Sequence, residues 1–377
     1  YSAGLGRRDI EAQVLFAGIQ SIYKRAYELQ WADLVIIDEA HLIPTKSDTM
    51  YRRFLDDVKN INPLVKFVGL TATPYRLDTG MLTEGENKLF DGISYEAPLS
   101  DMIEQGYLSP LVSKSTEEKL DISDVGKRGG EFIPHQLQAA VDIKEVTRAA
   151  VDEIVAYGHD RKGWALFCSG VDHAFNVRNE VRSRGILCEA IVGDTEKEER
   201  AQIIRDFKRQ KIQAIASMNV LTTGFNAPHL DLIAMLRPTA STGLYVQMAG
   251  RGTRNAPGKV NCLVLDFAGN VERHGPVDTA KGRNKKEGGE GTAPVKVCPQ
   301  CKSYVLIAVP LCPDCGFEFP PPKVKITPHA SQMEILSGIE KREKKWQKVT
   351  RAEYAMHRKP GKPPSMRATY FNGFLTV

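Results

Sequence analysis

The chain has 377 residues, of which 42% are hydrophobic and 26% are charged. These values are typical of a globular protein, and the length allows two or three domains of roughly 100–200 residues each. No run of 18 or more apolar residues occurs, so a transmembrane helix is not expected. The net charge is +5, yet residues 321–377 hold 12 Lys/Arg against 4 Asp/Glu, which indicates either contact with a polyanion or a solvated tail.

Apolar runs alternate with amphipathic stretches over residues 1–275, which predicts parallel sheets covered by helices. In the first part, Val14–Ile19, Leu34–Ile37 and Phe67–Leu70 are predicted buried strands, and Asp48–Val58 is a predicted helix. Residues 111–145 interrupt the pattern and are expected to connect two α/β units. The pattern then resumes in predicted strands and helices: Trp164–Cys168, Asp172–Arg184, Glu189–Val192, Glu196–Arg209, Ala214–Ser217, Leu230–Leu236 and Cys262–Asp266.

Acidic residues directly follow the predicted strand Leu34–Ile37, in the tetrapeptide Asp38-Glu39-Ala40-His41. Ligands of α/β proteins bind at the carboxyl ends of parallel strands. There, Asp38 could hold a hydrated Mg²⁺ that bridges phosphates, and Glu39 could orient and deprotonate a water molecule. A polar strand end that caps the next helix is the simpler alternative.

Three further motifs end predicted strands or open helices. Phe67–Leu70 leads into Thr71-Ala72-Thr73-Pro74, and residues 219–228 place threonines and a glycine where a phosphate backbone could be contacted. Residues 247–254 read Gln-Met-Ala-Gly-Arg-Gly-Thr-Arg, so Arg251 and Arg254 share a face of a helical turn and suit the charge on a transferring phosphoryl group. Each motif alone also fits an ordinary turn, loop or exposed pair.

In this order and spacing, the motifs resemble those of superfamily 2 DEAD/DEAH-box helicases, in particular the bacterial and phage type. The resemblance covers about residues 1–275 and implies two RecA-like domains, 1–110 and 146–275, joined by residues 111–145. It implies catalytic roles in ATP hydrolysis, with Mg²⁺, for Asp38, Glu39, His41, Gln247, Arg251 and Arg254. It also implies contacts to ATP from Thr71, Thr73 and Gly224, and to nucleic acid from Gln20, Ser169, Thr222 and Thr223.

Two features depart from that family. No G-x-x-x-x-G-K-[ST] loop, which would cradle phosphates, occurs in the sequence. We therefore expect the chain to be an N-terminally truncated fragment with little ATPase activity of its own, a non-hydrolysing paralogue being the alternative. In addition, Asn226 stands where related proteins commonly have an acidic residue.

Four of the seven cysteines form two Cys-Pro-x-Cys pairs, Cys298/Cys301 and Cys312/Cys315, separated by ten residues. Thiolates at these spacings can surround Zn²⁺ tetrahedrally, which predicts a zinc ribbon over residues 297–320. Two disulfides or spare thiols are the alternatives. The remaining cysteines lie singly in apolar stretches, as in a protein of a reducing, cytoplasmic compartment. A flexible linker is predicted over residues 276–296, and a basic tail over 321–377.

The sequence thus predicts an α/β protein with two RecA-like domains and a zinc ribbon, acting as an ATP-dependent helicase or translocase. DNA is the favoured partner over RNA, no membrane contact is expected, and the ribbon or tail could bind a protein. Two alternatives stay open: a non-hydrolysing zinc-containing nucleic-acid-binding scaffold, and the translocase subunit of a restriction system.

Overall fold

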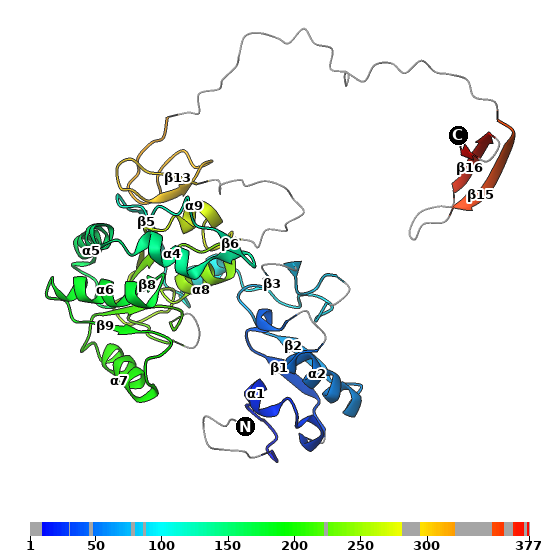
Figure 1. The fold of residues 1–377 in the computed structure, drawn as a ribbon, viewed down its shortest axis with the longest axis horizontal. Helices are drawn as coiled ribbons and strands as arrows, with labels where there is room; N and C mark the ends of the chain where they lie inside the picture. Colours follow the sequence, from blue (N-terminus) through cyan, green and yellow to red (C-terminus); the bar gives the residue numbers. More distant parts are fainter. Residues whose placement is uncertain are drawn as a thin grey trace, which may run out of the picture. The chain divides into compact units, whose positions relative to one another are not determined.

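The computed structural model describes residues 10–29, 31–44, 48–76, 80–85, 88–221, 225–280, 295–320, 349–357, 365–372 and 375–376 (Figure 1). The chain divides into two compact units, residues 1–320 and 321–377. In the described residues, no helix is long and apolar enough to cross a membrane.

The N-terminal part of the first unit is built on two parallel strands, β1 (Leu34–Ile37) and β2 (Lys66–Gly69). Helix α2 (Met50–Ile61) connects them, and its first turn is capped by the Thr49 side chain, which accepts from the Arg52 amide. Capping of this kind satisfies an amide that has no partner within the helix. Short helices precede the strands: α1 (Ile19–Ile22) and η2 (Ala26–Leu29).

The strand predicted at Val14–Ile19 is wrong. This segment forms no strand, and Val14 and Phe16 are 72% and 85% exposed. An apolar run becomes a buried strand only where neighbouring strands and helices cover it, and the β1–β2 pair has no further strand beside it in the described residues. For the same reason β1 is only partly buried, with Leu34 and Ile36 exposed.

A six-stranded parallel sheet forms the centre of the first unit, in the order β5-β12-β11-β8-β10-β9. Its strands are β5 (Leu111–Ser115), β8 (Trp164–Cys168), β9 (Cys188–Ile191), β10 (Ala214–Ser217), β11 (Leu232–Leu236) and β12 (Cys262–Asp266). Five of the six match the predicted strands to within two residues. Every residue of β8, β10, β11 and β12 is buried, as expected for strands covered on both faces.

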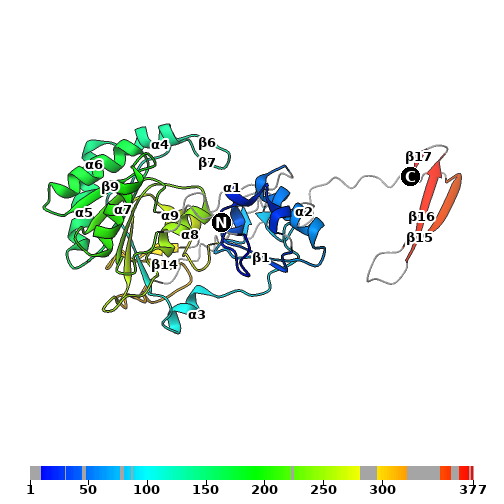
Figure 2. The same ribbon diagram turned by 90° about the horizontal axis from the view of Figure 1, so that it is seen from below.

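Helices cover both faces of this sheet (Figures 1 and 2). One face packs against α4 (Pro134–Val141), α5 (Lys144–Gly158) and α6 (Val171–Arg182), and contributes residues such as Leu166 and Ala234. The other face packs against α7 (Lys197–Lys208), α8 (Thr242–Gly250) and α9 (Asn270–His274), and contributes the alternate residues such as Phe167 and Met235. This alternation follows from the two-residue period of a strand.

Residues 111–145 do more than connect two units. Their first five residues form edge strand β5, which pairs with β12, and α4 places Leu137 and Val141 in the sheet's core. Between them lies a hairpin of β6 (Lys127–Arg128) and β7 (Glu131–Phe132). The division into domains stays a prediction.

The remaining elements are short. They are η3 (Ala40–Leu42), β3 (Tyr75–Arg76), β4 (Gly80–Met81), α3 (Leu99–Glu104), and the antiparallel pair β13 (Val295–Val297) and β14 (Tyr304–Leu306). The second unit holds an antiparallel sheet of β15 (Arg351–His357), β16 (Ser365–Asn372) and β17 (Leu375–Thr376). Most of the predicted linker and tail, residues 281–294 and 321–348, lies outside the described residues.

Candidate functional site

The two acidic residues lie at the carboxyl end of β1, as predicted. The Asp38 side chain is exposed, and its Oδ1 accepts a hydrogen bond from the Glu39 amide at 2.9 Å. Glu39 itself has a φ of +50°, a left-handed conformation that is uncommon for a residue with a side chain. The chain therefore turns sharply after β1, and the Glu39 carboxylate lies beside His41, two residues further on.

His41 joins three of the predicted site residues. Its Nδ1 lies 2.9 Å from Thr71 Oγ1 and 3.4 Å from Glu39 Oε2, and its Nε2 lies 3.1 Å from Nε2 of Gln247. Gln247 is on α8, so this contact brings the two motifs, 206 residues apart, into one hydrogen-bonded group.

The donors and acceptors of this group fix the tautomer of His41. The Gln247 amide nitrogen can only donate, so His41 Nε2 must accept and the ring proton is on Nδ1. Thr71 Oγ1 donates to the Thr73 carbonyl at 3.0 Å and can accept from His41 Nδ1. The His41 ring thus links the acidic turn, the threonine loop and helix α8.

Thr73 carries a buried hydroxyl. Its side chain is 1% exposed, and its Oγ1 has no hydrogen-bond partner among the described residues. A Cβ built on Gly243 of α8 would lie 3.7 Å from it. Because a buried hydroxyl without a partner is costly, this atom is a candidate contact for a ligand.

Arg251 and Arg254 both hold the loop that follows β10. Each donates through Nη1 to the carbonyl of Phe225, at 3.0 and 2.6 Å, and Arg254 also donates to Asn226 Oδ1 at 2.8 Å. Burial and the neighbouring Arg254 lower the pKa of Arg251, and the Glu39 carboxylate opposes this effect. The arginine pair is therefore hydrogen-bonded to the loop after β10, and Arg251 also lies near enough to the acidic turn for Glu39 to affect its pKa.

Several predicted site residues are not part of this group. Thr222, Thr223 and Gly224 lie outside the described residues. Gln20 is exposed on α1. Ser169 is 2% exposed, its hydroxyl donates to the Leu236 carbonyl at 2.9 Å and its amide donates to His173 Nδ1 at 3.3 Å, so both of its donors are used inside the protein.

Lys259 is a residue of this region that sequence reasoning missed. Its Nζ donates to the carbonyls of Gly252 and Arg254, both at 2.7 Å, and so fixes the end of the arginine segment. It belongs to no motif, and a lysine after a Pro-Gly turn gives no sequence signal for this contact.

Two family models match the chain. Residues 147–256 match the helicase conserved C-terminal domain, and residues 4–76 match the type III restriction enzyme, res subunit. These two matches support the predicted resemblance to superfamily 2 helicases. The predicted resemblance is thereby confirmed.

Individual relatives match different shares of the chain. The putative ATP-dependent helicase IRC3 of Saccharomyces cerevisiae is 29% identical over 69% of this chain and 38% of its own length. The putative mitochondrial ATP-dependent helicase irc3 of Schizosaccharomyces pombe is 32% identical over 64% of this chain and 39% of its own length. The chain thus spans about two-fifths of the length of these two helicases.

A phage protein and a solved structure extend the comparison. A 51.5 kDa protein of a Lactococcus phage is 24% identical over 81% of this chain and 66% of its own. The fragment of a putative HsdR subunit of a type I restriction enzyme from Vibrio vulnificus YJ016 has a TM-score of 0.52 and 22% identity, over 71% of this chain and 50% of its own. That likeness supports the RecA-like α/β fold.

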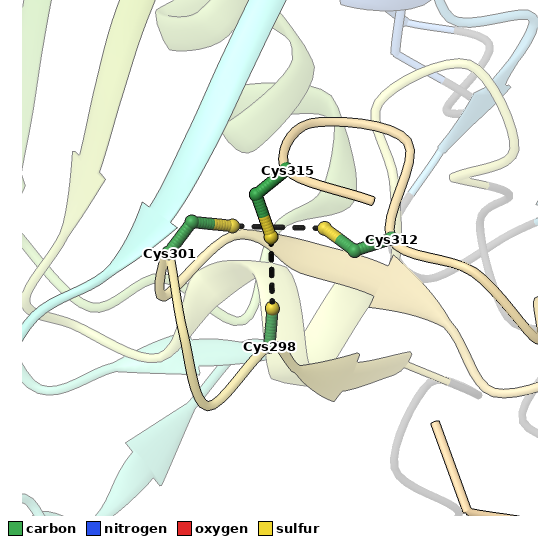
Figure 3. Close-up of side chains that lie close together, drawn as sticks. All are labelled: Cys298, Cys301, Cys312 and Cys315. Carbon is green, nitrogen blue, oxygen red and sulfur yellow. Dashed lines mark hydrogen bonds between the residues drawn. The ribbon is translucent and has the colours of Figure 1, made fainter. Parts of the chain in front are cut away.

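A second site lies outside the helicase regions, where the four cysteines of the two Cys-x-x-Cys pairs converge (Figure 3). All four sulfurs lie within 4.8 Å of one another, with Cys298–Cys315 and Cys301–Cys312 Sγ–Sγ distances of 3.6 Å. Sulfurs about 2.3 Å from a tetrahedral zinc ion would be just under 4 Å apart. The cluster is therefore compatible with zinc.

The two cysteine pairs sit in matching turns. The residue after each pair, Lys302 or Gly316, has a φ of +62° or +75°. In each turn that residue's amide donates to the carbonyl of the first cysteine, at 2.9 Å. Both turns therefore present two sulfurs on one side, which is the arrangement that a shared ion needs.

The cysteine module packs against edge strand β5 of the six-stranded sheet. The Ser115 amide donates to the Lys302 carbonyl at 2.8 Å, and Lys114 Nζ donates to the Cys301 carbonyl at 3.0 Å and to Asp314 at 3.2 Å. Tyr304 of β14 packs into the core of the sheet's second face. The module is therefore a part of the first unit.

Proposed function

We propose that the protein is an ATP-dependent nucleic-acid helicase or translocase. The observation that carries this is the His41–Gln247 hydrogen bond, since it joins the acidic motif to the arginine helix α8. Such a link lets a change at one motif alter the other, as a motor requires. The match to two superfamily 2 models supports the proposal, although the relatives are longer than this chain.

The residues present fit ATP and Mg²⁺. The exposed Asp38 carboxylate suits the hydrated cation, and the partly buried Glu39 suits the attacking water. Bound Mg²⁺ would supply neutralisation of phosphate charge. We assign Thr71, Thr73 and Gly224 to the nucleotide side, because Thr73 offers a buried hydroxyl that lacks a partner among the described residues. Arg251 and Arg254 would leave the Phe225 carbonyl for the phosphates.

We place the nucleic acid against Gln20, Ser169, Thr222 and Thr223. DNA is favoured over RNA because restriction enzymes, which one matching model describes, act on DNA. We assign Zn²⁺ to Cys298, Cys301, Cys312 and Cys315, since four thiolates with this spacing form a closed structural site. Thiolates of this kind persist in a reducing, cytoplasmic compartment.

The test is ATP hydrolysis by the full-length protein, with and without single-stranded or duplex DNA and RNA. Glu39→Gln removes the carboxylate and should abolish stimulated turnover. Glu104→Gln, at an exposed position of α3, is the matched control and should behave as the parent. If nucleic acid did not stimulate ATP hydrolysis by the parent, the alternative of a non-hydrolysing, zinc-containing binding scaffold would be favoured.

The match of residues 4–76 to a restriction-enzyme subunit favours a second candidate, a translocase that moves along duplex DNA without separating strands. Displacement of a third strand from a triplex, without release of a strand from a duplex, would single out this candidate. Strand release would support the helicase.

A further inference from the structure

The hairpin of β6 and β7 lies at the carboxyl edge of the six-stranded sheet and presents two cations. Lys127 and Arg128 are exposed, and a two-residue turn of Gly129 and Gly130 follows them. Both glycines have positive φ, +63° and +85°. A two-residue hairpin turn with positive φ at both positions suits glycine and matches the twist of the strands, so this short hairpin has a defined conformation.

The base of the hairpin is anchored to the loop after β11. The Glu131 carboxylate accepts from Thr239 Oγ1 at 2.5 Å and from the Ala240 amide at 2.9 Å. Phe132 is 5% exposed in the core, with Arg273 5.5 Å from its ring centroid. These contacts fix where the tip stands, at the rim of the sheet beside α4 (Figure 2).

The same edge carries further positive charge. Arg237 follows β11 directly and donates to Asn219 Oδ1, in the loop after β10. Burial lowers the pKa of Arg237, and the Glu131 carboxylate opposes this effect. Arg237 and Arg273 lie near the Glu131 carboxylate, and Arg273 also lies near Asp266 and Glu272. Lys127 and Arg128 therefore supply the exposed positive charge at this edge, where parallel sheets bind ligands.

We propose that the β6–β7 hairpin contacts the phosphate backbone of nucleic acid through Lys127 and Arg128. The inference rests on the proposed nucleic-acid motor and extends its binding surface to residues outside the helicase motifs. The loop after β10, which Arg237 joins to this edge, leads into the predicted nucleic-acid contacts Thr222 and Thr223.

The test is the salt dependence of binding by the full-length protein to fluorescent single-stranded and duplex DNA, without nucleotide. Each phosphate contact contributes about 0.7–0.9 to the slope of log K against log salt. We expect the double variant Lys127→Ala/Arg128→Ala to reduce this slope by about 1.4–1.8 and to weaken binding several-fold at low salt. Both side chains are exposed, but Lys127 Nζ also lies 5.3 Å from the centroid of the buried Phe132 ring. Thermal unfolding of the variant therefore checks that the hairpin stays folded.

A matched control comes from α7. Lys208 and Arg209 are also adjacent, exposed and cationic, but they precede β10 at the opposite, amino edge of the sheet. Lys208→Ala/Arg209→Ala should leave the slope as in the parent. The inference would be overturned if the hairpin variant had the same salt slope as the parent. It would also be overturned if both double variants reduced the slope equally.

The two proposals fail in different ways. If the parent binds DNA and hydrolyses ATP while the hairpin variant keeps its slope, only the hairpin inference is wrong. If the parent binds no nucleic acid, both are wrong. Retained binding with no hydrolysis by the parent overturns the motor and leaves the hairpin assignment supported by its slope.

Discussion

His41 and Gln247 meet through their Nε2 atoms, 3.1 Å apart, although 206 residues separate them in sequence. The His41 ring contacts Gln247 through one nitrogen, and Thr71 and Glu39 through the other. The contact therefore couples the acidic turn to α8 through one ring.

Replacement of Gln247 by leucine should weaken this coupling. The variant keeps the shape of the side chain but removes the donor, so stimulation of ATP hydrolysis by nucleic acid should fall about 5- to 150-fold, the range of typical coupling energies. The measurement is hydrolysis with and without DNA. In a double-mutant cycle with His41→Ala, the two effects should be strongly non-additive, whereas simple additivity would show that the contact has no coupling role.

Replacement of Arg251 or Arg254 by lysine should reduce kcat. A lysine cannot reproduce the planar fork of donors that an arginine presents to a phosphate, and loss of an arginine finger lowers kcat by about 10³–10⁵-fold. Single-turnover hydrolysis by the full-length protein is the readout. Arg209→Lys, on the exposed end of α7, should change nothing. Near-parental rates for both lysine variants would contradict the assigned roles.

The glycines of the arginine segment should differ in their tolerance of alanine. A Cβ on Gly252 would lie 2.5 Å from Cys262 Sγ and 2.9 Å from Ile233 Cδ1, whereas a Cβ on Gly250 meets nothing within 4 Å. Gly252→Ala should therefore destabilise the protein by about 1–3 kcal/mol through overpacking, and Gly250→Ala should be neutral or stabilising. Chemical unfolding measures both. Similar losses for the two variants would count against a steric cause.

Acidification should destabilise the six-stranded unit through His173. Burial lowers the pKa of His173 to about 4, although Asp142 opposes this effect. Because the unfolded side chain titrates near pH 6.5, stability is complete above that value and is lost as the pH falls towards 4, by at most about 3 kcal/mol. Unfolding from pH 7.5 to 4 should show the loss, and His173→Asn, whose side-chain oxygen can still accept from the Ser169 amide, should flatten the profile. If the free energy of unfolding of this variant fell with pH as steeply as that of the parent, His173 would be excluded as the cause.

Removal of the zinc ion that we propose for the cysteine cluster should loosen strand β5. A four-cysteine module of this size depends on the ion for its folding energy, and Ser115 and Lys114 bond to its backbone. Chelation should speed amide hydrogen exchange over residues 111–115. Lys114→Ala, which weakens the docking but spares the thiols, should have a smaller effect in the same direction and retain one equivalent of zinc. Unchanged exchange in the chelated protein would show that the module merely lies beside the sheet.

The strands of the second α/β part could be predicted from sequence because they are buried on both faces. Trp164–Cys168 is apolar throughout and Cys262–Asp266 is apolar up to its last residue, Asp266, and the observed β8 and β12 have the predicted bounds. Val14–Ile19 has a similar composition and yet forms no strand, since strand formation depends on partners that the run itself does not encode.

The candidate site could be predicted as a set of residues but not as an arrangement. Motif spacing indicated Glu39, Gln247 and the arginines, yet nothing local in the sequence shows that His41 reaches Gln247. The anchoring carboxylate Glu131 and the lysine Lys259 belong to no motif, because their roles arise only where distant loops meet.

The docking of the cysteine module on β5 has a consequence for solubility. β5 is an edge strand of the sheet, and the amide of Ser115 is covered by the Lys302 carbonyl, with Lys114 paired to Ser303 in an isolated antiparallel bridge. An exposed edge strand is a template on which other chains add and aggregate. Cells short of zinc would therefore be expected to accumulate this protein as insoluble aggregates well before its helicase core unfolds.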